Sequence, residues 1–131
     1  MTGAPSPLAL VDKSAWVRAD LAELGAQAAE LCLCDITRLE ILHSARTFDD
    51  YEQVDGSLGL LRPLASNAET WAIARTAQRE LARRGQHRVS LPDLLVAACA
   101  QQHGADVLHV DRHFDVLSAV LEFGSVRLRS A

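Results

Sequence analysis

Short apolar runs alternate along the chain with segments that have helical spacing. The first run, Leu8–Val11, has no polar interruption and leads directly into Asp12. Apolar runs of four to six residues are typical of strands that are buried on both faces of a parallel sheet. Five such runs predict strands, at 8–11, 31–34, 60–65, 106–110 and 125–129.

Amphipathic segments fill the intervals between these runs. They predict helices at 15–30, 35–45, 49–58, 67–85, 90–104 and 114–121, and Gly25 favours a division of the first into two shorter helices. Strands that alternate with helices predict an α/β fold, here a three-layer α/β/α sandwich with a mostly parallel sheet of about five strands. Pro63 lacks the backbone N–H that a central strand needs, so its strand is expected at a sheet edge.

The aromatic residues are expected to lie in the core of this sandwich. They are Trp16, Phe48, Trp71 and Phe114, and the spacing of Trp71, Ala74, Gln78 and Leu81 predicts the inner side of the longest helix. The chain contains no linker, low-complexity tract or repeat, so we expect one domain over residues 1–131.

The bulk composition excludes some classes of protein. The chain of 131 residues has no apolar run near the roughly 18 residues that cross a bilayer, and its start lacks the layout of a secretory signal. We therefore expect a cytoplasmic protein without membrane contact. Three cysteines, an odd number, argue against a disulfide framework and favour buried reduced thiols.

The net charge of −4 does not indicate a general nucleic-acid binder, since such domains are usually basic. This net charge is still compatible with a nuclease whose acidic residues are concentrated at a metal site while its arginines lie elsewhere. Arg75, Arg79 and Arg83 recur every four positions, and two interpretations stay open for them. They form either a solvated helix face or a track for the phosphates of RNA.

Four carboxylates stand out by their positions. Asp12 and Asp111 end predicted strands, while Glu40 and Asp93 open predicted helices. Each also has an ordinary structural explanation. Asp12 suits a turn and Asp111 suits a helix N-cap. Glu40 and Asp93 each follow a hydroxyl residue by three positions, as in a capping box.

Taken together, the four acids predict a metal site. Strand ends and the starts of the helices that follow parallel strands share one edge of a sheet, where α/β proteins bind their ligands. Carboxylates crowded there repel each other, and a divalent cation with hard oxygen ligands, Mg²⁺ or Mn²⁺, removes that repulsion. Phosphodiester hydrolysis is the reaction that uses such a site.

The order of these motifs resembles the PIN-domain ribonucleases, and more narrowly the VapC toxins of prokaryotic toxin–antitoxin pairs. The matching segments are Leu10–Ser14, Ile36–Leu42, Leu91–Ala98 and His109–Asp115, and the resemblance spans almost the whole chain. It implies a PIN fold, Mg²⁺- or Mn²⁺-dependent endoribonuclease activity on RNA, neutralisation by a VapB-like cognate antitoxin, and a homodimer.

The resemblance also implies roles for individual residues. The acidic catalytic and metal-site residues would be Asp12, Glu40, Asp93 and Asp111, with Asp115 as a possible fifth metal ligand and Ser14 as a supporter of the first. Many relatives carry Thr where this chain has Lys13 and His109; Lys13 would pair with the acids or contact phosphate, and Arg112 would contact substrate.

Two other functions remain open from the sequence. One is a PIN-like module that binds RNA or protein without cutting. The other is a metal-dependent phosphatase acting on small phosphoesters, which uses similar acids.

Overall fold

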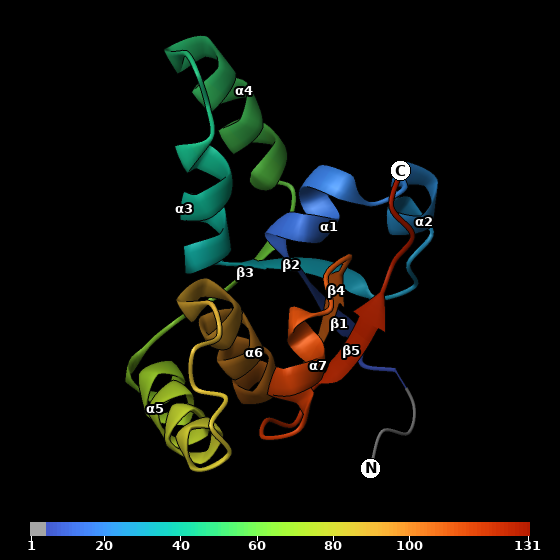
Figure 1. Cartoon of the computed structure of the whole chain (residues 1–131). Coiled ribbons are helices and arrows are strands. Elements are labelled where there is room, and N and C mark those ends of the chain that lie inside the picture. The colour runs from blue at the N-terminus through green and yellow to red at the C-terminus, as the bar shows by residue number, and fades with distance from the viewer. Residues whose placement is uncertain (1–4) are drawn as a thin grey trace.

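The computed structural model describes residues 5–131. Its helices and strands alternate as the apolar pattern predicts (Figure 1). The strands are β1 (Leu8–Val11), β2 (Glu30–Cys34), β3 (Arg62–Leu64), β4 (Asp106–His109) and β5 (Gly124–Arg127). The helices are α1 (Lys13–Arg18), α2 (Leu21–Gly25), α3 (Asp35–His43), α4 (Phe48–Leu58), α5 (Ala68–Arg83), α6 (Leu91–His103) and α7 (His113–Ser118).

The five strands form one sheet in the order β3-β2-β1-β4-β5, and every neighbouring pair is parallel. The predicted α/β fold is therefore confirmed. Pro63 lies in the edge strand β3, as its missing N–H requires. β1 occupies the centre, so the residue that follows it, Asp12, lies in the middle of the edge formed by the carboxyl ends of the strands.

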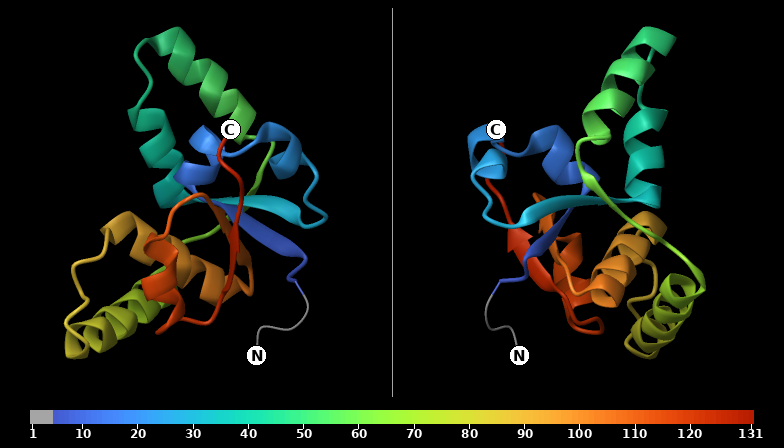
Figure 2. Two further views of the ribbon diagram at one scale, coloured as in Figure 1. Left: turned by 45° about the vertical axis from the view of Figure 1, so that its right-hand side comes forward. Right: turned by 180° about the vertical axis from the view of Figure 1, so that it is seen from behind.

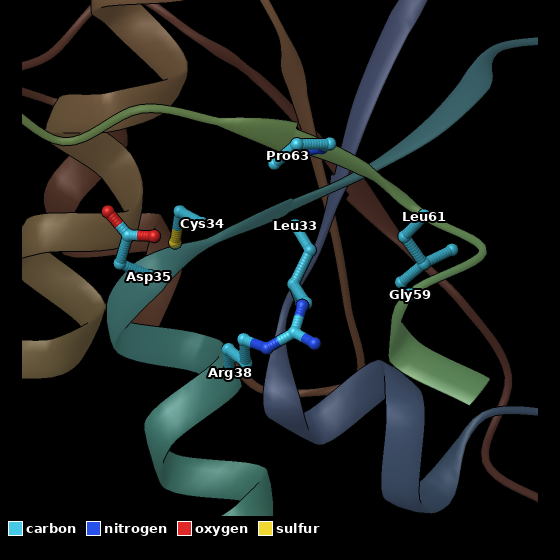
Figure 3. A pocket seen from close by; sticks show the side chains of 7 residues that line it. All are labelled: Leu33, Cys34, Asp35, Arg38, Gly59, Leu61 and Pro63. Carbon is cyan, nitrogen blue, oxygen red and sulfur yellow. The ribbon is translucent and has the colours of Figure 1, made fainter. Parts of the chain in front are cut away.

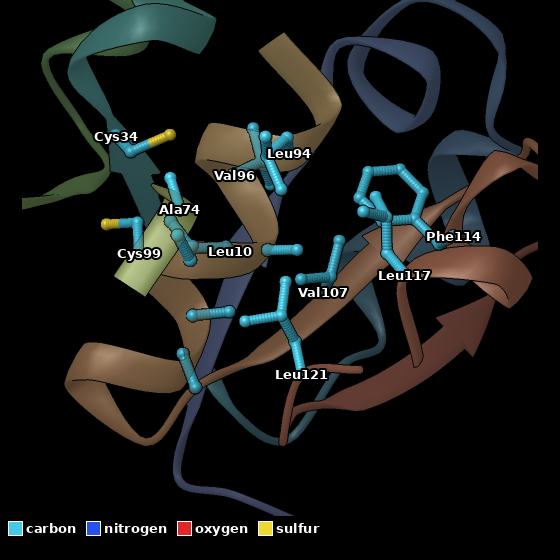
Figure 4. Packing of buried hydrophobic residues seen from close by; sticks show 14 of the residues in the cluster. Leu10, Cys34, Ala74, Leu94, Val96, Cys99, Val107, Phe114, Leu117 and Leu121 are labelled. Atoms are coloured by element: carbon cyan, nitrogen blue, oxygen red, sulfur yellow. The ribbon is translucent and has the colours of Figure 1, made fainter. Parts of the chain in front are cut away.

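Helices cover both faces of the sheet (Figures 1 and 2). Leu10 and Val107 point to the face covered by α5, α6 and α7, where they pack with Phe114 and Leu117 (Figure 4). Ala9 and Val11 point to the opposite face, which is covered by α1 and α2. Both faces of β1 are thus buried, which explains why its sequence shows no alternation of apolar and polar residues.

Small residues bring α5 close to α6. The buried row of α5 is Thr70, Ala74, Ala77 and Leu81, and it faces an alanine-rich stretch of α6. The prediction that Trp71 and Gln78 share this inner side was wrong, since Trp71 is 57% exposed and Gln78 is also exposed. A helix residue one position from the buried row points about 100° away from it, and two helices packed through alanines leave no room for an indole ring.

The placement of Phe48 in the core was also wrong. Phe48 is the first residue of α4 and is 74% exposed, because the pair of helices α3 and α4 extends beyond the sheet (Figure 1). Phe114 is fully buried and Trp16 is half-buried against the core.

Cys32, Cys34 and Cys99 are free and buried, as predicted. Within residues 5–131, every helix is too short or too polar to span a membrane.

The two phenylalanines provide a test of this core. Phe114→Ala should lower the free energy of unfolding by about 3–5 kcal/mol, because it empties a fully buried site. Phe48→Ala removes the same atoms from an exposed site and should change it by less than about 0.5 kcal/mol. Urea denaturation of both variants measures the difference, and equal losses would contradict the described packing.

Candidate active site

Asp12 is held in place by the turn that joins β1 to α1. It caps α1, and its Oδ2 accepts hydrogen bonds from the Ser14 backbone N at 3.0 Å and from the Ser14 Oγ at 2.7 Å. The Ser14 Oγ in turn accepts from the Val110 backbone N at 3.0 Å. Because Val110 follows β4, this chain of bonds ties the ends of the two central strands together around one carboxylate that is only 4% exposed.

The charge of Asp12 acts on two further acids. The pKa of Asp93 is raised to about 6, first by burial and then by the negative charge of Asp12, with a smaller contribution from Asp111, while His113 opposes the shift. Burial and the charge of Asp12 also raise the pKa of Glu40, and the ammonium group of Lys13 lowers it. The structure therefore brings these acids near enough to oppose each other's ionisation.

Two basic side chains that the sequence did not single out face the acids. The Nδ1 atom of His113 lies 3.3 Å from Oδ2 of Asp93 and 3.5 Å from Oδ1 of Asp111. The guanidinium of Arg18 lies 3.4 Å from the other oxygen of Asp111. Arg18 and Asp111 are 93 residues apart and His113 and Asp93 are 20 apart, so no local pattern could have revealed these two contacts; only the contact between His113 and Asp111 is local.

A local capping role fits Asp12, which caps α1, but accounts poorly for the other three acids. α3 begins at Asp35, so Thr37 is a buried interior residue and cannot be the N-cap of a box with Glu40. Ser90 does cap α6 and accepts from the Asp93 backbone N at 3.4 Å, but the Asp93 carboxylate is directed to His113. The N-cap of α7 is Arg112, not Asp111.

His109 braces the loop that carries Asp111. It is 1% exposed; its Nδ1 accepts from the Asp111 backbone N at 3.2 Å, so its Nε2 carries the proton and donates to the Ser125 Oγ at 2.7 Å. Its ring packs on Phe114, with 4.8 Å between centroids. Burial lowers the pKa of His109, which favours this neutral form. A threonine would be too short to join β4 to β5 in this way.

The remaining predicted residues lie at the rim. Lys13 is half-buried and its charge lowers the pKa of Glu40, but among residues 5–131 Lys13 forms no salt bridge with an acid. Arg112 and Asp115 are exposed, at the start and in the first turn of α7. Asp115 contributes to the electrostatic environment of His109.

The donor types fit a hard cation, although the side chains do not form a closed cage. Among residues 5–131, no three His, Cys, Asp or Glu side chains stand close enough together to bind one ion. Carboxylate oxygens are nevertheless what Mg²⁺ and Mn²⁺ take. The pKa values of Asp93 and Glu40 are raised first by burial and then by the charge of Asp12, and a bound cation would favour the ionised carboxylates against both effects.

A small pocket elsewhere does not include the acids. It has a volume of about 110 Å³ and lies between α3, the end of α4 and the strands β2 and β3 (Figure 3). Arg38 lines it and pairs with Asp55 of α4, and the rest of its wall is largely apolar, from Leu33 to Pro63. The candidate active site thus lies outside this pocket, at the edge formed by the strand ends.

Comparisons with known proteins agree with this fold. The sequence profile of the PIN domain family matches residues 9–120. Ribonuclease VapC17 of Mycobacterium tuberculosis is 39% identical over 116 residues, which are 85% of this chain and 87% of the relative. Ribonuclease VapC18 of the same organism is 37% identical over 119 residues, 84% of this chain and 87% of the relative. The chain belongs to the PIN-domain family.

Solved structures show the same fold at lower identity. VapBC-5 from Mycobacterium tuberculosis, a toxin–antitoxin system, matches with a TM-score of 0.72 and 21% identity, covering 94% of this chain and 100% of that one. VapBC2 from Rickettsia felis, solved with a promoter DNA fragment, matches with a TM-score of 0.76 and 16% identity, covering 93% and 99%.

The raised pKa of Asp93 predicts a pH dependence of stability in metal-free buffer. The folded protein binds this proton more tightly than the unfolded chain does, so the free energy of unfolding should fall as pH rises from about 4 through about 6. Asp93→Asn should remove this loss and leave the variant about 2 kcal/mol more stable than the original chain at pH 8. Urea denaturation across this range measures it.

Asp49→Asn is the matched control, because Asp49 is an exposed acid in the first turn of α4. It should keep the original pH profile. The same profile in Asp93→Asn and Asp49→Asn would contradict the electrostatic picture of the site.

Proposed function

We propose that this chain is a metal-dependent endoribonuclease toxin of the VapC kind, which hydrolyses RNA phosphodiester bonds and is neutralised by a VapB-like antitoxin. The curated relatives named as VapC ribonucleases are matched over 84–85% of this chain, and the solved neighbours are toxin–antitoxin complexes. The observation that carries the proposal is the acid cluster around Asp12, where burial and mutual repulsion raise the pKa of Asp93 to about 6.

The proposed ligands of the metal are Asp12, Glu40, Asp93 and Asp111, with Asp115 as a further candidate. Mg²⁺ or Mn²⁺, when bound, supplies a water of lowered pKa and stabilises charge on the attacked phosphate and the leaving oxygen. Both hydrogen bonds from Ser14 fall on Oδ2 of Asp12, which leaves Oδ1 for a ligand.

The surrounding residues have proposed supporting roles. Ser14 fixes the Asp12 carboxylate, and the His109 brace fixes the backbone of Asp111. In the metal-free protein, an oxygen of Asp93 holds a proton in about half of the molecules near pH 6. Lys13 and Arg112, which lie beside the acids, are proposed to contact the phosphates of the substrate.

The antitoxin is proposed to dock on the early helices. Val17 in α1, Leu21 in α2 and Leu39 in α3 are 63%, 77% and 64% exposed, a large apolar exposure for three short helices. Exposed apolar groups on neighbouring elements are typical of protein interfaces.

Substitution of the acids tests the catalytic proposal. Asp12→Asn and Asp93→Asn should each lower the rate of RNA cleavage by the purified protein more than about 100-fold, because changes outside the ligand shell already cost about 10- to 100-fold at metal sites. Asp49→Asn should cleave at the original rate. Growth inhibition in a bacterial host should follow the same order.

Three outcomes would contradict the proposal. Original cleavage rates in both acid variants would remove the acids from catalysis. A lack of any thermal stabilisation by millimolar Mn²⁺ would favour the non-catalytic binding module. Hydrolysis of a generic phosphate ester without cleavage of RNA would favour a phosphatase.

Ser14 provides a separate test of how Asp12 is positioned. Ser14→Ala keeps all the acids but removes the hydroxyl bond to Asp12, so the Mn²⁺ concentration for half-maximal cleavage should rise about tenfold or more. Ser14→Thr keeps the hydroxyl and should restore most of the affinity. Equal metal requirements in Ser14→Ala and the original chain would contradict this role.

A further inference from the structure

The positive charges of the chain are concentrated in one segment. Residues 75–88 contain five of the 13 basic residues and only one of the 17 acidic residues, so this segment has a net charge of +4 in a chain of net −4. All five are arginines and all five are exposed. The segment comprises the second half of α5 and the loop that leads to α6.

Three of these arginines form a ridge with an exposed tryptophan on the outer side of α5. We define this basic ridge as Trp71, Arg75, Arg79 and Arg83, which are spaced four residues apart. Successive members lie about 6 Å apart along the helix axis and turn only about 40° around it, so they share one side. That side is opposite the buried row of α5, which explains the exposure of the indole.

Most of the charge on this ridge is not neutralised by the protein. Arg83 and the adjacent Arg84 share one carboxylate, Glu80, at 3.6 Å each. Within residues 5–131, Arg75 and Arg79 take part in no ion pair. Unpaired exposed arginines produce a positive potential that attracts polyanions.

The helix that carries the ridge is followed in the chain by α6, which carries Asp93 of the candidate active site. The amide of Gln102, near the end of α6, donates to Asn67 at the start of α5 at 2.8 Å, so the two helices are antiparallel. The loop after α5, residues 84–90, leads back to the first turn of α6, which carries Asp93 (Figures 1 and 2).

We propose that the basic ridge is a binding surface for single-stranded RNA, separate from the acids that cut it. This inference deepens the proposed function and rests on it. Arginine suits phosphate because its planar guanidinium donates in a fork, and an exposed indole provides a platform on which a base stacks. At the four carboxylates, only the bound cation and the rim residues Lys13 and Arg112 would attract RNA, so a separate basic surface adds to the attraction for the substrate.

A second copy of the chain fits the ridge less well than RNA does. In a two-fold dimer the same patch meets itself, and this would set Arg75 and Arg79 of both copies against each other. Unpaired like charges at an interface oppose association. RNA carries the complementary charge along a length that matches an extended ridge.

The salt dependence of RNA binding tests the proposal. Affinity for a short unstructured fluorescent RNA would be measured by anisotropy in EDTA, where the RNA is not cut, between about 50 and 200 mM salt. The double variant Arg75→Gln, Arg79→Gln should bind more weakly at every salt concentration, and the slope of log affinity against log salt should become shallower by about 1.4, or about 0.7 for each lost contact. Trp71→Leu should weaken binding about fivefold or more, with little change in slope.

The matched control removes the same charge elsewhere. Arg46→Gln, Arg129→Gln changes two exposed arginines that lie outside α5 and its loop. It should keep the slope and affinity of the original chain, whereas Arg75→Lys, Arg79→Lys should keep most of the slope.

Several results would overturn the ridge proposal. The first is an equal slope of log affinity against log salt in the ridge variants and the control variant. The second is a ridge variant that binds RNA normally but changes its oligomeric state in light scattering. The third is a ridge variant that binds RNA normally but no longer binds the antitoxin. Failure of the original chain to cleave RNA with Mn²⁺ would instead defeat the proposed function. The two failures are thus distinguishable.

Discussion

The cost of ionising partly buried carboxylates beside one another is the constraint on which the site depends. Asp12 lies at the centre of the edge formed by the strand ends, and its charge raises the pKa of Glu40 and of Asp93. A fold that places these acids together loses stability when they ionise. The arrangement makes physical sense when a cation joins the acids, and the basic groups Lys13, Arg18 and His113 lie close by as partial compensation.

The parallel sheet makes this convergence possible. Every strand ends at the same edge, so residues far apart in sequence meet there without any long loop. Ser14 then locks Asp12 to the backbone after β4, and His109 locks that backbone to β5. The positions of Asp12 and Asp111 are therefore set by hydrogen bonds between neighbouring strands and not by flexible side chains alone.

Charge is segregated over the molecule in a way that the net value hides. The acids gather at the strand ends, whereas residues 75–88 carry a charge of +4 on the outer side of α5 and its loop. A chain of net −4 is thereby compatible with an RNA substrate. The close packing of α5 on α6 through alanines turns the basic ridge outward, so a feature of the core determines which surface is available.

The sequence by itself determined the alternation of strands and helices, the edge position of Pro63 and the identities of the acids, because each depends on local spacing or backbone chemistry. It also predicted buried reduced cysteines. Tertiary structure alone decided which aromatics are buried: Trp71 and Phe48 have ordinary core spacing, yet close helix packing and the projecting α3–α4 pair leave them exposed. It also decided that Arg18 and His113 face the acids and that His109 bridges two strands, since these contacts join residues whose proximity depends on the folded path of the chain.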